Sequence, residues 1–569
     1  MTPVLAALAA FAAYFLGYRI YSSFLAERVF GLRADAVTPA HALTDGVDYV
    51  PSRPAVLFGH HYASITGLAP MLGPAVAVIW GWLPALLWVV LGSLFVGCVH
   101  DFSALVISVR HEGRSVGEVA AEVIGPRART LFHLIIFFGV SLAMGVFVFV
   151  ISQLFSVELA PGHAGYPQAV LPSGLLMIVA MVAGVLLYRR GYPLAPVAGV
   201  GFAIELFGIW LGMKFPTLGL SAAAWPVAST WIWVLLAYAF AASVMPVWAL
   251  LQSRDFLNSL LLYLGLGLAY IGLFVGNPSF VAPAVVANPA GAPPIFPFVF
   301  IVIACGAASG FHGLVSSGTT AKQLDRETHA RPIGYGGMVG ESLLGLLATL
   351  ACTAGFASPE TWHAHYADWS AVQGLATKID AFIQGTTVFL SNLGLPVDLS
   401  AALIAMVVVS FALTTLDSAT RVLRFNLEEI GATFRVPGSQ NRYLSSVAAC
   451  GAIAFFAFYE VNGKPAALAL WALFGTTNQL LAGLTLALAT LYLRHRGRPT
   501  WPTGIPTIFM LLSTIYAMVE NLARFRSGSQ ADPLLFVVGG VLLVLATWLL
   551  VESALALRRS PQGATHGAR

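Results

Sequence analysis

The stretch Gly59-His60-His61-Tyr62-Ala63-Ser64-Ile65-Thr66-Gly67 interrupts an apolar run that is otherwise long enough to cross a membrane. A second apolar run is interrupted by Ala304-Cys305-Gly306-Ala307-Ala308-Ser309-Gly310-Phe311-His312. Broken backbone is tolerated at membrane depth only where protein or a water-filled cavity covers its freed amides and carbonyls. Paired broken helices are typical of transporters, whose substrates bind at the breaks. The two stretches therefore predict a transporter.

The composition agrees with a membrane protein, because 58% of the residues are hydrophobic and only 9% are charged. Soluble domains carry far more charge. The basic residues stand singly between apolar runs rather than in one patch, which argues against nucleic-acid binding. We expect a single transporter domain over residues 1–569 in the cell (inner) membrane, with no enzymatic activity and no cofactor.

Two local patterns exclude other classes. Cys98, Cys305, Cys352 and Cys450 all lie in apolar runs without a CxxC motif, which gives no support to a disulfide framework, a zinc finger or covalent haem attachment. The first apolar run, residues 2–18, has no Lys or Arg before it, unlike a signal peptide. We expect a retained helix whose N-terminus lies outside.

Apolar segments long enough to cross a bilayer recur along the chain. We expect fifteen crossing helices, at residues 2–22, 57–79, 82–109, 130–154, 172–188, 194–213, 230–250, 256–276, 296–316, 334–356, 398–420, 443–460, 466–492, 506–522 and 533–557. A further segment, 377–393, contains Lys378, Asp380 and Gln384, which suit a surface-lying or re-entrant helix better. A sixteenth crossing at this segment stays open.

The charges orient these helices. With the N-terminus outside and the C-terminus cytoplasmic, all but five of the 29 Lys and Arg residues fall inside, as the positive-inside rule requires. The exceptions are Lys214, Lys378, Lys464, Arg524 and Arg526. The two broken helices then cross in opposite directions, as an inverted repeat requires. We expect repeats at 57–213 and 296–492, an inserted helix pair at 230–276 and a C-terminal pair at 506–557.

Histidines accompany both breaks. A neutral imidazole there could bind a carboxylate, shuttle a proton or ligate a metal. The alternative is that the histidines pack at a helix entrance and cap its first turn. We expect the substrate to contact residues around the two breaks and two amides of a later helix: Gly59, His60, His61, Ser64, Gly310, His312, Ser317, Thr319, Asn478 and Gln479. The amides could instead only hold helices together.

Three carboxylates lie inside apolar runs, namely Asp101, Glu205 and Glu341. Charged groups at that depth should face the protein interior and be partnered. Because burial favours the protonated form of a carboxylate, we expect these three to carry a coupling proton. The alternative for His100-Asp101 is an inert pair with a serine such as Ser103, and for Glu205 and Glu341 a structural hydrogen bond.

Asp417 and Arg421 have a different spacing. They are four residues apart, so they share one face of a helix near its cytoplasmic end. We therefore expect a structural ion pair between them.

Taken together, these residues resemble the carbon starvation protein A family of membrane transporters. The resemblance is carried, in order, by GYRIY at 17–21, TDGVDYVP at 44–51, FGHH at 58–61, HDF at 100–102, QSRDFLN at 252–258, residues 305–319, TLD at 415–417 and FGTTNQ at 474–479. The chain departs from the family at Ser253, where we expect Pro, and at Ala307-Ala308, and it is shorter than the larger members. These departures affect the substrate more than the fold.

The resemblance implies a fold related to the amino acid–polyamine–cation transporter superfamily, with inverted repeats and two unwound helices. It also implies uptake of peptides or pyruvate, coupled to protons, during nutrient limitation. We interpret the chain as a proton-coupled importer that works by alternating access around the two breaks. Amide ends of the half-helices near 67–73 or 310–320 would attract a carboxylate.

Two other classes stay open. An intramembrane metal- or haem-binding redox protein could use His60, His61, His100 and Asp101 as ligands, although no HExxH or other compact metal spacing occurs. A passive channel is the second class, and the buried carboxylates favour coupling over a leak. The choices between peptide and pyruvate, between proton and sodium, and between monomer and oligomer also stay open.

Overall fold

The computed structural model describes residues 1–160, 162–461, 464–465, 467–527 and 531–558. Residue 466, where a helix is predicted to begin, lies outside the described residues, as do Arg559 and Arg569, which the predicted topology places inside.

Long apolar helices make up most of the protein. Within the described residues, ten are long and apolar enough to cross a bilayer, or eleven if a bent pair counts as one span. The ten are Pro3–Phe30 (with α1 Pro3–Leu16 and α2 Ser22–Phe24), Trp82–Val109 (with α6 Trp82–Leu87 and α7 Cys98–Val109), α9 Pro126–Phe155, Pro167–Arg189 (with α10 Val170–Gly184), α11 Leu194–Lys214, α13 Leu251–Gly276, Glu327–Ala354 (with α16 Gly336–Ala354), α19 Val397–Phe434, α22 Trp501–Arg526 and α23 Pro533–Arg558. The chain is therefore a multi-pass helical membrane protein.

Other helices and strands join these helices or pack against them. They are the helices α3 Pro39–Ala42, α8 Val116–Val123, α12 Ala228–Val244, α17 Pro359–His365, α18 Leu375–Ser391, α20 Arg442–Ala457 and α21 Ala467–His495, and the antiparallel strand pairs β1 Glu158–Ala160 with β2 His163–Ala164 and β3 Glu460–Val461 with β4 Lys464–Pro465. Each of the fifteen segments predicted to cross contains a helix. The count of fifteen crossings stays a prediction.

Both predicted breaks are present. The first apolar segment forms α4 (Pro54–Ile65) and α5 (Ala69–Ala77), which bend by 45° across residues 66–68. The second forms α14 (Ile295–Val302) and α15 (Gly310–Gly318), separated by residues 303–309. Gly306 adopts a φ of +85° within this second break, a conformation that L side chains rarely adopt, which explains a glycine there.

Helix α18 corresponds to the segment predicted to lie on the surface or re-enter. Twelve of its 17 residues are buried, Lys378 among them, and it packs against α5, α13, α16 and α19. The surface-lying interpretation is therefore wrong, because α18 is covered by four helices rather than on one face only.

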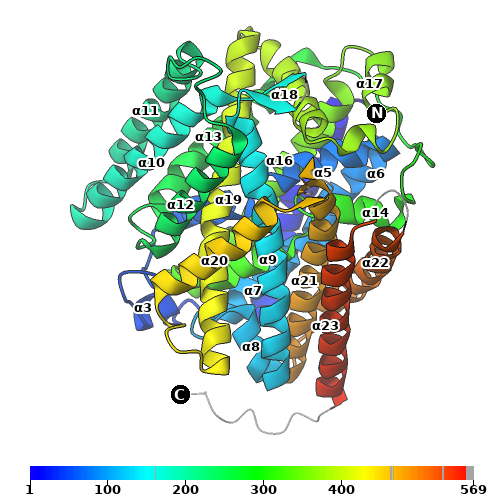
Figure 1. Cartoon of the computed structure of the whole chain (residues 1–569). Helices are drawn as coiled ribbons and strands as arrows, with labels where there is room; N and C mark the ends of the chain where they lie inside the picture. Colours follow the sequence, from blue (N-terminus) through cyan, green and yellow to red (C-terminus); the bar gives the residue numbers. More distant parts are fainter. Residues whose placement is uncertain (161, 462–463, 466, 528–530, 559–569) are drawn as a thin grey trace.

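The long helices α9 and α19 run through the middle of the protein and pack against each other (Figure 1). Helices α10 and α11 stand on one side of this pair, and α22 and α23 on the other (Figure 1). One large apolar cluster extends across most of these helices. The polar side chains of the breaks are embedded in it.

Candidate functional site

Three ionisable side chains from three helices meet in the interior. Asp101 lies in α7, His312 in the first turn of α15 and Glu341 in α16, and all three are 0% exposed. Nδ1 of His312 is 3.0 Å from a carboxylate oxygen of Asp101. Nε2 of His312 is 3.1 Å from a carboxylate oxygen of Glu341. We call Asp101, His312 and Glu341 the His312 cluster.

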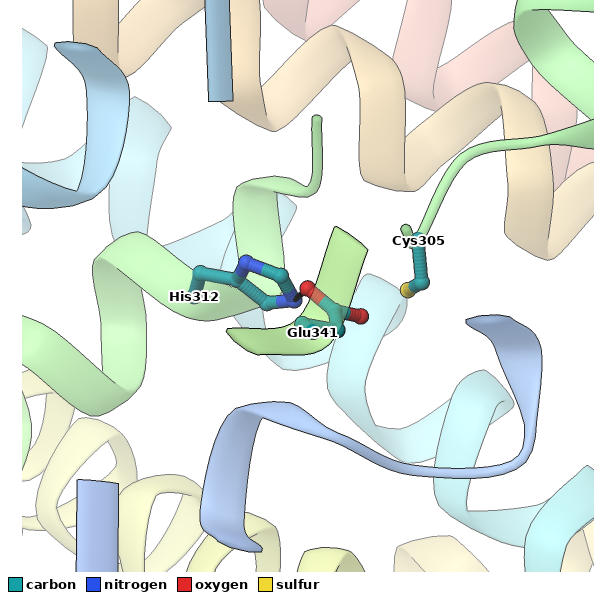
Figure 2. A group of neighbouring side chains, drawn as sticks. All are labelled: Cys305, His312 and Glu341. Carbon is teal, nitrogen blue, oxygen red and sulfur yellow. Dashed lines mark ion pairs between the residues drawn. The ribbon is translucent and has the colours of Figure 1, made fainter. Parts of the chain in front are cut away.

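Two further contacts extend the cluster to the helix break. Nδ1 of His100 is 2.8 Å from the other oxygen of Asp101, and the backbone N–H of Gly306 donates to Glu341 at 3.1 Å. Figure 2 shows His312 and Glu341 facing each other, with Cys305 nearby. The carboxylates predicted to face inward and be partnered do so at Asp101 and Glu341.

The geometry of the His312 cluster suits proton exchange. An imidazole that faces two carboxylates can donate to both only when it carries two N–H groups, which is its protonated form. In this structure the Nδ1 contact to Asp101 is a hydrogen bond and the Nε2 contact to Glu341 is an ion-pair contact, so loss of the proton removes the positive charge that Glu341 faces. The arrangement can therefore take up or release a proton while its side chains stay in place.

Two amides of α21 hold the second break. Nε2 of Gln479 donates to the carbonyl oxygens of residues 300, 304 and 308 at 3.2, 3.3 and 2.9 Å. Oδ1 of Asn478 accepts from the backbone N–H of Phe311 at 2.8 Å and from the Ser309 hydroxyl at 3.2 Å. These bonds satisfy backbone groups that the break frees, so they join α21 to the break. The contacts favour the helix-holding alternative for both amides.

The histidine pair of α4 lies before the first break rather than in it. His60 and His61 are helical, and the chain leaves the helix only after Ile65. Nδ1 of His60 is 2.6 Å from Asp255, and Nδ1 of His61 is 2.9 Å from the Thr320 hydroxyl. The prediction that the two histidines lie in the break is therefore wrong. Helix α4 continues to Ile65, and Pro70 lies in the first turn of the next helix, α5.

Three other side chains predicted to contact the substrate, those of Ser64, Ser317 and Thr319, are also buried. Ser64 donates to Asp255 at 3.2 Å, while Ser317 and Thr319 donate to carbonyl oxygens of their own helix at 2.7 and 3.0 Å. Gly59 and Gly310 face other helices. A Cβ added at Gly59 would lie 2.8 Å from the Ser259 hydroxyl, and one added at Gly310 would lie 2.4 Å from the carbonyl oxygen of residue 478.

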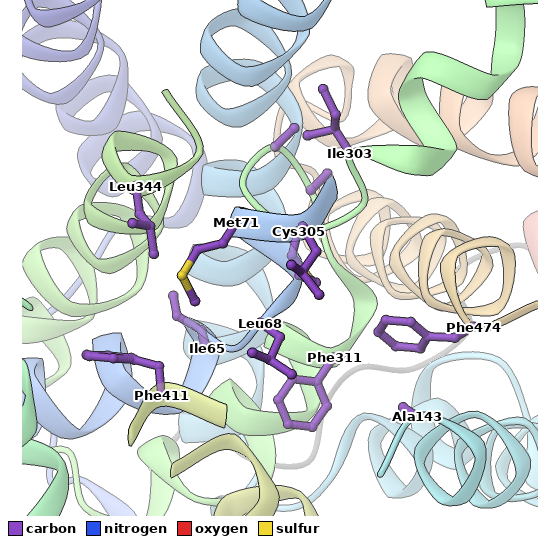
Figure 3. Packing of buried hydrophobic residues seen from close by; sticks show 14 of the residues in the cluster. Ile65, Leu68, Met71, Ala143, Ile303, Cys305, Phe311, Leu344, Phe411 and Phe474 are labelled. Carbon is purple, nitrogen blue, oxygen red and sulfur yellow. The ribbon is translucent and has the colours of Figure 1, made fainter. Parts of the chain in front are cut away.

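The two breaks touch each other. A Cβ added at Gly73 of α5 would lie 2.6 Å from the carbonyl oxygen of Val302, at the end of α14. Leu68, Met71 and Phe311, which are 0%, 0% and 7% exposed, pack at this junction (Figure 3). The structure therefore brings the predicted site residues of the two breaks to one place, filled by apolar side chains.

The predicted ion pair between Asp417 and Arg421 is wrong. Asp417 pairs instead with Arg254 of α13, and Arg421 pairs with Asp48 at 2.6 Å. Tyr238 also donates to Asp417, at 2.5 Å. The four-residue spacing does place both side chains on α19, but tertiary partners supplied by other elements replace the local pair.

Glu205 stands apart from the His312 cluster. It lies in α11 and is 1% exposed, and neither of its carboxylate oxygens has a hydrogen-bond partner within the described residues. No described contact joins it to Asp101 or Glu341. The structure thus brings together two of the three carboxylates that were predicted to carry a proton.

The proposed metal ligands of the redox alternative are not assembled. In the described part of the chain, the groups that could hold a metal are Cys305 with His312 and Glu341, and Glu118 with His133 and Glu429. His60, His61 and His100 belong to neither. Nδ1 of His312 is hydrogen-bonded to Asp101, while its Nε2 faces Glu341 and has no hydrogen-bond partner within the described residues. That geometry can serve a proton, and it also leaves Nε2 able to bind a metal ion.

Residues 252–258 carry part of the family resemblance but were not predicted as site residues, and the first four lie between the predicted helices 230–250 and 256–276. Helix α13 begins at Leu251, so Arg254 and Asp255 are helical and at most 1% exposed. Gln252 donates to Ser52 at 2.6 Å and to Gln323 at 2.5 Å. The sequence signal that could have identified Arg254 and Asp255 is an adjacent Arg and Asp at the start of an apolar run. Charged side chains in a membrane helix are buried only when they have partners.

Comparison with known proteins gives one family. Residues 2–364 and 357–517 match the family described as carbon starvation protein CstA. The peptide transporter CstA of Bacillus subtilis is 32% identical, over 95% of this chain and 94% of its own length. The peptide transporter CstA of Campylobacter jejuni is 32% identical, over 92% and 80%. The pyruvate/proton symporter BtsT of Escherichia coli is 30% identical, over 91% and 81%.

A solved structure of the Eremococcus coleocola manganese transporter aligns with 91% of this chain and 99% of its own, at 14% identity and a TM-score of 0.41.

Proposed function

The chain belongs to the CstA family of carbon starvation proteins, and we propose that it is a secondary active importer of small carboxylates or peptides that is driven by protons. Its relatives are named as peptide transporters and as a pyruvate/proton symporter. Peptides and pyruvate share a carboxylate, so both fit the same class of site. Pyruvate and a dipeptide are therefore the two solutes to test first.

The His312 cluster carries this proposal. Coupling needs a group that holds a proton in one conformation and releases it in another, away from bulk water. Asp101 and Glu341 flank His312 at 3.0 and 3.1 Å in a site that is 0% exposed. We assign the coupling proton to this cluster. Glu205 is a second candidate, tested by its own Glu205→Gln variant.

The packing between the breaks supports alternating access as part of this proposal. A solute can occupy the junction of the two breaks only if Leu68, Met71 and Phe311 move aside. Bending at residues 66–68 and 303–309 would open that space on one side at a time. An inverted repeat of 57–213 and 296–492, fifteen crossings and an outside N-terminus in the inner membrane complete the proposal.

Uptake into proteoliposomes tests the proposed function. We expect labelled pyruvate or a labelled dipeptide to accumulate when the inside is made alkaline relative to the outside. Collapse of the pH gradient with an uncoupler should stop accumulation. Equal uptake with and without the gradient would instead indicate a passive pathway, and no uptake of either solute would contradict the proposal.

One observation favours a second candidate. Ligand atoms of Cys305, His312 and Glu341 lie within 4.8 Å of one another, which is close enough for a metal ion to bridge them. Elemental analysis of the purified protein separates the two functions. A stoichiometric transition metal that is lost in Cys305→Ser would support a metal protein, and its absence from a protein that transports would leave the proton role.

A further inference from the structure

A cavity of about 620 Å³ opens beside α8 and the last turns of α19. That volume lies within the range of small-molecule sites. Six charged residues line it: Glu118, Arg129, Lys322, Glu428, Glu429 and Arg435. Three of these residues are acidic and three are basic, so their formal charges cancel. They differ in whether each side chain already has a partner.

Each of the three acidic groups has a partner, and for Glu118 one of them, Arg129 at 3.5 Å, lines the cavity as well. Glu118 lies 3.3 Å from His133, and Glu429 accepts from the Ser115 hydroxyl at 2.8 Å. Glu428 lies 3.9 Å from Arg424 of its own helix. Two of the basic groups, Lys322 and Arg435, form no ion pair within the described residues. The three acidic and three basic groups balance in formal charge, so the lining differs in donors rather than in net charge: among the described residues, no carboxylate occupies the N–H donors of Lys322 and Arg435.

Lys322 is held in a defined position. Its ammonium lies 3.6 Å from the centre of the Phe425 ring and 5.4 Å from that of Tyr49. Its stem packs beside Gly113, where an added Cβ would lie 3.2 Å from the Cγ atom of the lysine. Aromatic faces stabilise a cation but leave its N–H donors unused. Burial lowers the pKa of Lys322, and the carboxylates of Asp48 and Glu429 partly offset that effect.

Lys322 also lies close in sequence to the breaks. It follows α15 and ends a short helical turn, Thr320–Lys322. The hydroxyl of Thr320, two residues earlier, is 2.9 Å from His61 of α4. The cavity therefore adjoins the end of the second broken helix, where that helix contacts the first.

We propose that this cavity is an anion vestibule in which the Lys322 ammonium binds the carboxylate of the transported solute on the side where the cavity opens. The predicted topology makes that side cytoplasmic. The inference rests on the proposed function for the identity of its ligand. Arg435, which is exposed and also lines the cavity, adds a second positive charge that attracts anions.

Chemical protection tests binding without requiring transport. The purified protein is treated with an acetylating reagent alone, with pyruvate, with a dipeptide or with inorganic phosphate, and acetylation of Lys322 is measured by mass spectrometry. We expect pyruvate or the dipeptide to protect Lys322, and phosphate at the same concentration to protect it less. Exposed Lys214 is the internal control and should react equally throughout. Equal protection by phosphate, or none by any solute, would overturn the proposal.

Transport kinetics give the second readout. In proteoliposomes assayed from the side of the cavity, Lys322→Gln should raise KM roughly 10- to 100-fold, the effect of losing one charge-assisted hydrogen bond. Lys322→Arg should recover most of the affinity, and Lys214→Gln should match the wild type. An unchanged KM in Lys322→Gln would contradict the vestibule. If the wild type takes up neither solute, the proposed function fails and the protection experiment alone decides whether Lys322 binds a carboxylate.

Discussion

Nε2 of His312 lies 3.1 Å from a carboxylate oxygen of Glu341, and neither side chain reaches solvent. The opposite nitrogen of the same ring lies 3.0 Å from Asp101. The imidazole thus joins α7 to α16 from the first turn of α15, the helix that follows the second break. A change in its protonation alters the contacts of all three helices at once.

Glu341→Gln should uncouple transport from the proton gradient. The amide keeps an oxygen that can accept from the Gly306 N–H, but it cannot take a proton from His312. We expect gradient-driven accumulation to fall by roughly 100-fold, the lower range for a positioned proton-transfer group. Exchange of labelled for unlabelled solute should persist, because it needs no net proton movement. Both rates are measured in the same proteoliposomes.

The control for this variant is Glu360→Gln, at an exposed carboxylate in the first turn of α17. It should accumulate solute like the wild type. Normal accumulation in Glu341→Gln would show that the coupling proton is carried elsewhere.

Gly73→Ala should disturb the junction of the two breaks. The new Cβ would lie 2.6 Å from the carbonyl oxygen of Val302, so α5 and α14 would have to separate. We expect a loss of about 1–3 kcal/mol in the free energy of unfolding, as for overpacking in a core, together with reduced uptake. Thermal unfolding in detergent and uptake in proteoliposomes measure the two effects.

Gly174→Ala is the matched control, because nothing lies within 4 Å of a Cβ added there in α10. The same alanine should be neutral or slightly stabilising at that site. A Gly73→Ala variant that unfolds and transports like Gly174→Ala would contradict the close contact between the breaks.

The helices and both breaks could be predicted from the sequence because their signals are local. Apolar length marks each membrane helix, and the glycines near residues 67 and 306 mark the points where helical hydrogen bonds stop. Asp101 and Glu341 could be singled out for the same reason, since a carboxylate in an apolar run has a cost that only a partner offsets.

The partners themselves could not be predicted in this way. Asp417 and Arg254 are 163 residues apart in the sequence, and His312 and Asp101 are 211 apart. No periodic pattern connects positions so distant. The nearby Arg421 was the obvious partner of Asp417 on helical spacing, yet tertiary packing gave each residue a different one.

Asp48→Asn should release the loop that precedes α4. Asp48 lies 2.6 Å from Arg421 and 3.3 Å from Arg424, both on α19. Burial raises the pKa of Asp48, but Arg421, Arg424 and Lys322 outweigh it and hold the pKa below its ordinary value of 3.8. The stabilisation is therefore fully present above pH 3.8 and is lost as the pH falls through the lower pKa of the folded protein.

At pH 7 we expect Asp48→Asn to lower the free energy of unfolding by about 1–3 kcal/mol, the range for hydrogen bonds to charged groups. The difference from wild type should persist unchanged down to about pH 4 and shrink at more acidic pH. Asp35→Asn, at an exposed ion pair, should stay within about 0.5 kcal/mol of wild type. A difference that disappears between pH 7 and pH 5 would show that Asp48 is not held in its ionised form by these arginines.

Asp417→Asn should be more damaging than loss of the whole ion pair. Arg254 is 1% exposed and Asp417 is 0% exposed, so removing one charge leaves the other buried without compensation. We expect a loss of about 3–5 kcal/mol in the free energy of unfolding.

Replacing both residues, in Arg254→Met with Asp417→Leu, removes both buried charges and should recover much of that stability. Thermal unfolding of the two single variants and the double variant measures the coupling. Equal and additive losses would mean that the two charges do not compensate each other, and that the contact between α13 and α19 depends on the apolar packing around them.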